Sequence, residues 1–390
     1  MLPVLGIGES PIFNKIFKFK KSAKKAKHKL KIERVVSHLL NKIMRISVIK
    51  KILRQELSAT NDGTNTPVML WGPPGVGKSQ IVAQIAAEQD TQLIDIRLSQ
   101  LEPSDLRGIP FRTQDSDVEW AIPRMLPNKE RHGEVGILFL DEINAAPPSV
   151  SAAAYQLILD RKLGDYRVPD GWVIFAAGNR QGDRGVAYAM PAPLANRFSH
   201  YELEANLEDW VDWAMKHNID EHLIGFLRFR PELLFEYISE QNPIAFPSPR
   251  TWEFADRALK KFADTPQLLS VAFEAAVGQA VGIELMAYLE HLENLPDIDA
   301  ILNGENVEVP TEVDLQYAIA AALTRRAKSI TDIKADKPKL ENILLFANKF
   351  PQREMGVMLV SDLHRILDDE LFNLEQFTPW AQDTVGLLTE

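Results

Sequence analysis

Residues 72–79 combine glycines, a lysine and a serine in a spacing that suits the binding of phosphate groups. They read Gly-Pro-Pro-Gly-Val-Gly-Lys-Ser and match the pattern G-x-x-x-x-G-K-[ST]. Gly75 and Gly77 allow backbone N–H groups to curve around phosphate oxygens, because no Cβ atom obstructs the approach. Lys78 can then neutralise the β- and γ-phosphates, and Ser79 can ligate Mg²⁺. The spacing therefore predicts a binding site for ATP with Mg²⁺.

The segments on either side of this loop have the character that such a site requires. Apolar residues 68–71 predict a buried strand before the loop, and residues 80–89 predict a helix after it. The N-terminus of a helix carries a partial positive charge that attracts phosphate. A chance Gly-rich loop is the alternative, and it would not need this strand and helix around it. The predicted nucleotide-binding residues are Gly72, Pro73, Pro74, Gly75, Val76, Gly77, Lys78, Ser79 and Gln80.

A second motif places two carboxylates directly after an apolar run. Residues 137–140 read Ile-Leu-Phe-Leu and are followed by Asp141 and Glu142. A buried strand that ends in this way would present both carboxylates at the phosphate site. Asp141 would hold Mg²⁺ through its water shell, and Glu142 would polarise the attacking water. An apolar run that ends in Asp-Glu is common in strands, so the catalytic interpretation depends on the phosphate-binding loop upstream.

A third apolar run, Val173–Gly178, ends in Asn179. An amide at this strand end could orient the attacking water or contact the γ-phosphate. The plain alternative is an ordinary turn, because Gly-Asn is a frequent pair in turns.

The spacing of apolar residues predicts the elements that position these groups. Short apolar runs alternate with helical stretches up to about residue 205, which indicates a five-stranded parallel sheet with crossover helices. The predicted strands are Pro67–Trp71, Leu93–Arg97, Gly136–Leu140, Trp172–Ala177 and His200–Leu203. Helical periodicity follows in Leu207–Lys216, Thr251–Phe262, Leu268–Leu292, Glu312–Ala327 and Leu340–Asp368.

Taken in order, these motifs resemble those of the AAA+ superfamily. More narrowly, the chain resembles the MoxR-type ATPases, within the clade that carries a helix-2 insertion and a pre-sensor-1 insertion. The resemblance covers about residues 45–260. It is carried by residues 72–79, Asp141 with Glu142, Asn179, the segment Pro193-Leu-Ala-Asn-Arg197-Phe and the segment Pro247-Ser-Pro-Arg250.

The resemblance implies roles for three of these residues. Asn179 would be sensor 1, Arg197 the arginine finger that reaches the ATP of a neighbouring subunit, and Arg250 sensor 2 in a helical lid. An arginine finger supplies positive charge to the transferred phosphoryl group and raises the rate about a thousandfold or more. The plain alternatives are a surface arginine at a strand start for Arg197 and a mildly unfavourable helix-terminal cation for Arg250. Ala192 and Asn196 stand where the family often carries acidic residues. The chain therefore departs from the family's pattern at the expected subunit interface.

Charge and periodicity divide the chain into four expected parts, and the resemblance implies two inserted hairpins. The expected parts are a basic N-terminal extension (1–43), an α/β nucleotide-binding domain (44–205), a helical lid (206–340) and a C-terminal helical extension (341–390). Residues 98–127 resemble the helix-2 insertion, and residues 163–170 resemble the pre-sensor-1 hairpin. In such rings these loops usually face the pore or the client protein, whereas the plain alternative is a pair of exposed hairpins.

Charge and composition limit the class of partner. The chain has 390 residues, no cysteine and a net charge of −10. Residues 1–56 hold fifteen Lys and Arg against three Glu, whereas the remainder holds 29 basic and 51 acidic residues. The acidic body argues against a general nucleic-acid surface. No run is apolar and long enough to span a membrane, and no secretory signal stands at the start, so we expect a cytoplasmic protein. The basic extension (1–43), or basic arm, is either a solvated leader or a contact for anionic lipid or nucleic acid. Met44 is an alternative start of translation.

Three hypotheses for function follow. The first is a MoxR-like ATPase that forms a homo-oligomeric ring, a hexamer, and works with a von Willebrand factor A-domain partner. It would remodel client proteins or insert a metal or cofactor into them. The second is a DNA-directed motor of the helicase or restriction-translocase kind, supported by the basic arm alone. The third is a non-hydrolysing scaffold, against which Glu142, Asn179 and Arg197 argue together.

Overall fold

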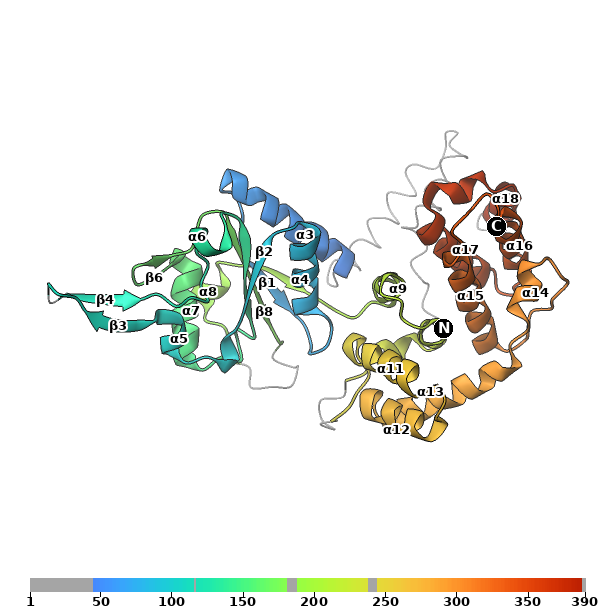
Figure 1. The fold of residues 1–390 in the computed structure, drawn as a ribbon, viewed down its shortest axis with the longest axis horizontal. Helices are drawn as coiled ribbons and strands as arrows, with labels where there is room; N and C mark the ends of the chain where they lie inside the picture. The colour runs from blue at the N-terminus through green and yellow to red at the C-terminus, as the bar shows by residue number, and fades with distance from the viewer. Residues whose placement is uncertain (1–44, 116, 181–187, 238–243, 388–390) are drawn as a thin grey trace.

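The computed structural model of the chain describes residues 45–115, 117–180, 188–237 and 244–387 (Figure 1). The predicted basic extension and the alternative start at Met44 lie outside these ranges. An α/β part comes first along the chain and a helical part follows it, as the colour change in Figure 1 shows. Within the described ranges, no helix combines the length and the apolar character that crossing a bilayer requires.

Five parallel strands form one sheet, in the spatial order β2-β5-β8-β1-β9. Each predicted strand is confirmed, and every strand end lies within one residue of its prediction. Strands that bear the predicted site, β1, β5 and β8, lie together in the middle of the sheet. The strands are β1 (Val68–Trp71), β2 (Gln92–Arg97), β5 (Gly136–Asp141), β8 (Trp172–Gly178) and β9 (Ser199–Glu202).

Helices cover both faces of this sheet, which explains why its central strands are apolar throughout. Neighbouring residues Ile137 and Leu138 of β5 point to opposite faces. Ile137 packs in a core with α3 (Ile46–Ser58) and α4 (Lys78–Glu88). Leu138 packs in a second core with α7 (Pro148–Asp160). Because neither face meets water, a strand here needs apolar residues at consecutive positions rather than at alternate ones.

Two antiparallel hairpins are inserted in the α/β part, and the longer one projects away from the sheet (Figure 1). Both hairpins that the sequence predicts are confirmed as hairpins. They consist of β3 (Ile109–Arg112) with β4 (Val118–Ala121), and of β6 (Lys162–Leu163) with β7 (Tyr166–Arg167). Three short helices complete this part: α5 (Pro103–Arg107), α6 (Lys129–His132) and α8 (Ala192–Ala195).

The part after residue 206 is helical, as predicted, and two of the predicted helical stretches are each divided into two helices. The stretch 268–292 is broken at Gly278, whose φ of +90° is unfavourable for any residue with a side chain. The stretch 340–368 is broken before Pro351, a residue that cannot continue the backbone hydrogen bonding of a helix. The helices are α9 (Leu207–Lys216), α10 (Glu221–Phe229), α11 (Pro249–Phe262), α12 (Pro266–Val277), α13 (Gln279–His291), α14 (Ile298–Leu302), α15 (Val313–Lys328), α16 (Lys337–Ala347), α17 (Arg353–Leu367) and α18 (Phe377–Leu387).

Two apolar cores hold the helical part together. One core lies among α9 to α13 and includes Trp252 and Phe226, both fully buried. The other lies among α14 to α18 and includes Leu323 and Leu359. The division of the chain at residues 205 and 340 stays a prediction, because a packing core does not establish an independent domain.

A buried ion pair joins these two cores. Both guanidinium Nη atoms of Arg228 on α10 donate to Asp362 on α17, at 2.5 and 2.7 Å, and Asp362 is fully buried. Arg365 donates to the same carboxylate at 2.6 Å and to Glu208 on α9 at 2.7 Å. Burial lowers the pKa of Arg228, but the charge and hydrogen bonds of Asp362, together with the charge of Glu208, outweigh it and raise that pKa, so the guanidinium stays charged. A buried charge of this kind needs its partner.

We predict that Asp362→Ala lowers the free energy of unfolding by about 3–5 kcal/mol, because it leaves the Arg228 charge buried without this carboxylate. Urea denaturation followed by circular dichroism measures the change. Glu375→Ala is the control, because Glu375 forms an exposed ion pair with Lys337 and its loss should change stability little. Equal stability of the two variants would contradict the prediction.

Candidate active site

The loop between β1 and α4 folds as the glycine spacing requires. Gly75 and Gly77 have φ angles of +85° and +97°, a backbone region that residues with side chains rarely adopt. Gly77 is the N-cap of α4, so the helix begins at Lys78 rather than at Gln80 as predicted. A Cβ atom on Gly75 would lie 2.8 Å from the Ser248 hydroxyl oxygen, which belongs to the residue before α11. Ser248, just before α11, therefore borders the loop directly.

The ammonium group of Lys78 lies buried under this loop. It donates hydrogen bonds to the carbonyl oxygens of Gly72 at 2.5 Å and Pro73 at 3.0 Å, and to Oδ1 of Asn179 at 3.0 Å. The residue is 9% exposed. Exchange of these neutral oxygens for phosphate oxygens would give the ammonium charged partners, which form stronger hydrogen bonds. The loop and Lys78 thus fit a nucleotide phosphate.

Ser79 and Asp141 lie in contact at the end of β5. The Ser79 hydroxyl donates to Oδ2 of Asp141 at 2.6 Å, and the backbone N–H of Glu142 donates to Oδ1 of Asp141 at 2.9 Å. Burial raises the pKa of Asp95 on β2, and the negative charges of Asp141 and Glu142 raise it further. Hydroxyl and carboxylate oxygens beside concentrated negative charge are the surroundings that Mg²⁺ prefers. The residues present therefore fit Mg²⁺.

Glu142 has an unusual backbone conformation for its residue type. Its φ angle is +56°, in the left-handed region that glutamate seldom adopts. Its carboxylate accepts a hydrogen bond from the hydroxyl of Ser99, which follows β2. Sequence reasoning missed Ser99, because nothing in the sequence shows that the end of β2 lies beside the end of β5. Such backbone strain is frequent at functional sites, where surrounding contacts stabilise it.

Asn179 is held by a second asparagine that sequence reasoning also missed. The amide of Asn144 donates to the backbone carbonyl of Asn179 at 2.7 Å and accepts from its backbone N–H at 3.2 Å. Asn144 is buried. A Cβ atom at position 178 would lie 2.4 Å from Oδ1 of Asn144, so this contact requires Gly178. The backbone clamp leaves the Asn179 side chain directed at Lys78.

The two predicted arginines occupy different places. Arg250 lies in the first turn of α11, whose cap residue Ser248 borders the phosphate-binding loop. Arg197 lies between α8 and β9 and is exposed. In the part of the chain that the structure describes, no hydrogen bond or ion pair joins the Arg197 guanidinium to the site. The structure thus brings together residues 72–79, Asp141, Glu142 and Asn179, and leaves Arg197 outside that cluster.

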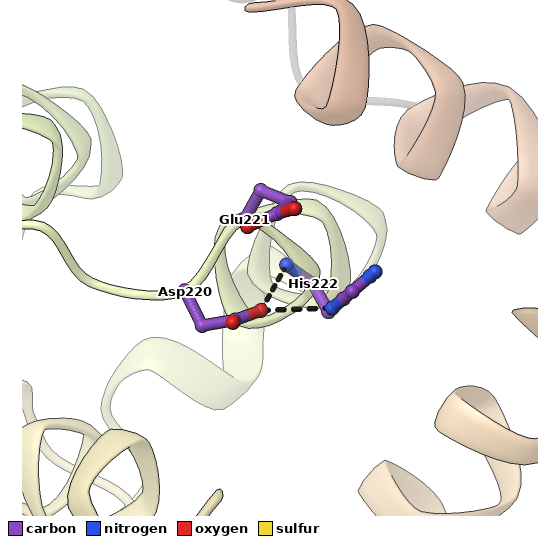
Figure 2. A group of neighbouring side chains, drawn as sticks. All are labelled: Asp220, Glu221 and His222. Carbon is purple, nitrogen blue, oxygen red and sulfur yellow. Dashed lines mark hydrogen bonds and ion pairs between the residues drawn. The ribbon is translucent and has the colours of Figure 1, made fainter. Parts of the chain in front are cut away.

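A separate acidic cluster at the start of α10 resembles a metal site in its composition alone. Ligand atoms of Asp220, Glu221 and His222 lie within 4.8 Å of one another (Figure 2). Asp220 caps α10, and its Oδ1 accepts from the backbone N–H of His222 at 2.9 Å and pairs with its Nδ1 at 2.8 Å. Arg325 pairs with Glu221 and lies 4.0 Å from Asp220. The cluster is therefore explained by the capping of α10 by Asp220 and by the cation Arg325 that pairs with it.

Comparison with known proteins gives the following relationships. Residues 68–202 match the family model of the ATPase family associated with various cellular activities (AAA). The chain is 25% identical over 256 residues to the Holliday junction branch migration complex subunit RuvB 1 of a Synechococcus strain, covering 56% of this chain and 61% of that protein. It is 27% identical over 157 residues to midasin of Giardia intestinalis, covering 38% of this chain and 3% of that protein. The chain thus spans less than two thirds of either relative.

One solved structure with partial likeness is the Thermotoga maritima RuvB Holliday junction branch migration motor. Its TM-score is 0.33 at 19% identity, with 76% of this chain and 87% of that chain covered. A likeness of this size supports no inference about function.

We predict that Asn144→Ala lowers kcat for ATP about tenfold or more, because Asn179 loses two backbone hydrogen bonds. The dissociation constant for ATP should change less, since these hydrogen bonds of Asn144 hold Asn179 rather than the phosphate-binding loop. Steady-state ATPase assays and fluorescent-nucleotide titration measure the two quantities. Asn303→Ala, at an exposed helix end, is the control. An unchanged kcat would show that Asn179 does not need the clamp.

The Asp220–His222 pair predicts a pH dependence of stability. Burial lowers the pKa of His222, but the hydrogen bond and charge of Asp220 outweigh it and raise that pKa. Burial raises the pKa of Asp220, and His222 outweighs it and lowers that pKa overall. His222 thus stabilises the fold fully below about pH 6.5 and loses this effect as the pH rises through its folded pKa. Asp220 stabilises above about pH 3.9 and loses this effect as the pH falls through its folded pKa.

We therefore expect His222→Gln to lower Tm more at about pH 5 than at about pH 9. Thermal unfolding in matched buffers gives the two differences. His217→Gln serves as the control, because His217 bonds to the Trp213 carbonyl and has no carboxylate partner among the described residues. Equal losses of Tm at both pH values would contradict the assignment of the pair.

Proposed function

We propose that this chain, whose residues 68–202 form an ATP-hydrolysing P-loop domain of the AAA family, works as a ring ATPase that acts on proteins. The observation that carries the proposal is the contact of Lys78 with Asn179, beside Asp141 and Glu142. Asp141, Glu142 and Asn179 come from the ends of the neighbouring strands β5 and β8, and Lys78 begins the helix that follows the loop after β1. Their types suit phosphoryl transfer to water.

Each residue of the cluster has a separate task in this proposal. Lys78 and the backbone N–H groups of residues 72–79 hold the β- and γ-phosphates of ATP. Ser79 and Asp141 hold Mg²⁺, which, when bound, neutralises charge on the phosphate oxygens. Glu142 accepts a hydrogen bond from the attacking water and orients it, and Asn179 positions that water or the γ-phosphate.

Arg197 supports the proposal of a ring. Transfer of the γ-phosphoryl group needs positive charge beside the phosphate oxygens. Arg250 can supply this charge from the first turn of α11, whose cap residue borders the loop. Arg197 is exposed and lies outside the catalytic cluster of its own subunit. We assign Arg197 to the ATP of a neighbouring subunit. A site that each subunit shares with the next is repeated around a closed ring, and we propose a hexamer.

The β3–β4 hairpin supports a protein client. Ile109 is 67% exposed and Val118 is 63% exposed, and Phe111 and Trp120 are exposed as well. Figure 1 shows the hairpin projecting away from the sheet. Exposed apolar surface of this kind marks interaction sites. As in MoxR-type ATPases, the ring would remodel its client or insert a metal or cofactor into it, together with a von Willebrand factor A-domain partner.

A second candidate is a DNA-directed motor. The observation in its favour is the 25% identity over 256 residues with a Holliday junction branch migration subunit. The excess of acidic residues beyond residue 56 opposes it, because phosphate backbones attract basic surfaces. ATPase assays with double-stranded DNA at several salt concentrations separate the candidates. A salt-sensitive stimulation would favour the motor, and an unchanged rate would favour the protein client.

We predict that Glu142→Gln binds ATP as tightly as the wild type and does not hydrolyse it, since the amide keeps the size of the side chain and loses its charge. Lys78→Ala should lose binding itself, because the phosphates lose their buried cation. Fluorescent-nucleotide titration and phosphate release distinguish the two outcomes. Turnover by the Glu142→Gln variant would overturn the assignment of Glu142.

We predict that Arg197→Ala lowers kcat about a thousandfold or more. Assembly of this variant with Glu142→Gln subunits should restore activity, because some interfaces then combine an intact Glu142 with an intact Arg197. Phosphate release from mixed and unmixed preparations measures the restoration. Mass determination shows whether the rings contain both variants. If such mixed rings are no more active than the unmixed ones, the assignment of Arg197 to the neighbouring subunit is contradicted.

A further inference from the structure

Trp71, the last residue of β1, contacts the strand that follows Arg197. Its indole N–H donates to Nδ1 of His200 at 2.9 Å. The two rings are stacked, with centroids 6.0 Å apart and planes inclined by 13°. Trp71 also precedes Gly72 directly, so its backbone is the start of the phosphate-binding loop.

The second nitrogen of His200 reaches the segment that leads to Arg197. Nε2 lies 2.7 Å from the carbonyl oxygen of Ala195, the last residue of α8. Because Nδ1 accepts from Trp71, a neutral imidazole carries its hydrogen on Nε2 and donates it to Ala195. The two hydrogen bonds together therefore require one tautomer of His200. Phe198 packs edge-on against the same ring, with centroids 6.2 Å apart.

Arg197 belongs to the turn that His200 holds. The backbone N–H of Arg197 donates to the Leu194 carbonyl at 2.9 Å, and that of Phe198 donates to the Ala195 carbonyl at 3.2 Å. Displacement of the Ala195 carbonyl therefore displaces the backbone that carries Arg197. His200 is exposed, so water could satisfy both of its nitrogens. The two hydrogen bonds of His200 are therefore not required merely to satisfy buried polar atoms, and this points to a role in positioning.

We infer that Trp71 and His200 are positioning residues that set the place of Arg197 relative to the phosphate-binding loop of the same subunit. This inference rests on the proposed function, in which Arg197 serves the ATP of the neighbouring subunit. The backbone of Trp71 is itself fixed on the other side, because its carbonyl accepts from the Leu203 N–H at 2.7 Å. A movement of the loop at one ATP site is thereby passed through two side chains to the arginine of the next site.

A double-mutant cycle of ATPase rates tests the inference. Trp71→Phe keeps an aromatic ring and loses the donor, and His200→Ala loses both hydrogen bonds. Each variant should lower kcat about tenfold to a hundredfold while the dissociation constant for ATP stays within about twofold, because a misplaced catalytic group affects the reaction more than binding. Combined with Arg197→Ala, neither variant should lower kcat further. Tyr201→Phe on the same strand is the control and should keep the full rate.

The outcomes of this experiment distinguish a failure of the positioning role of Trp71 and His200 from a failure of the arginine-finger role of Arg197. Losses of kcat that add to that of Arg197→Ala would overturn the inference alone, because they would show that His200 acts elsewhere. A full rate for Arg197→Ala would overturn the arginine-finger proposal and the inference with it. Thermal unfolding and light scattering identify folded, assembled variants. If His200→Ala does not fold, Trp71→Phe carries the same test.

Discussion

A buried ammonium group at the carboxyl edge of the sheet is the constraint on which the site depends. Removal of the Lys78 charge from water costs several kcal/mol unless polar atoms surround it. The carbonyls of Gly72 and Pro73 and the amide oxygen of Asn179 do so here. For the carbonyls to point inward, the loop must turn back through residues 75 and 77. For Asn179 to reach the ammonium, β8 must end beside β1, as it does in the sheet order.

The polar residues of the site lie at strand ends and are hydrogen-bonded by residues from neighbouring segments. Strand ends project their side chains beyond the last ladder hydrogen bonds, so each needs a partner from a neighbouring segment. Ser79 supplies one to the Asp141 side chain and Ser99 to that of Glu142, whereas Asn144 holds the backbone of Asn179. Behind these contacts the central strands are apolar on both faces and covered by helices. The resulting site has the apolar sheet as its base and, in Ser248 before α11, one neighbour that belongs to the helical part.

Much of the fold and part of the site could be predicted from the sequence. The central strands are recognisable because burial on both faces makes them continuously apolar, and the phosphate-binding loop because its glycines are fixed by backbone geometry. Ser99 and Asn144 escaped prediction because their partners depend on which strand ends are neighbours, and strand order does not appear in the apolar pattern. The break at Gly278 escaped it because apolar periodicity continues through that residue. Arg228 and Asp362 pair across 134 positions of sequence, a distance at which periodicity carries no information.

The central claim is that the complete catalytic site is shared between two subunits, with Arg197 supplied by the neighbour. The most direct measurement is ATPase activity per subunit across a range of protein concentrations, with molecular mass determined by light scattering on the same samples. The account predicts low activity per subunit where the protein is monomeric and a rise that follows assembly. Full and constant activity per subunit in samples that remain monomeric would contradict it.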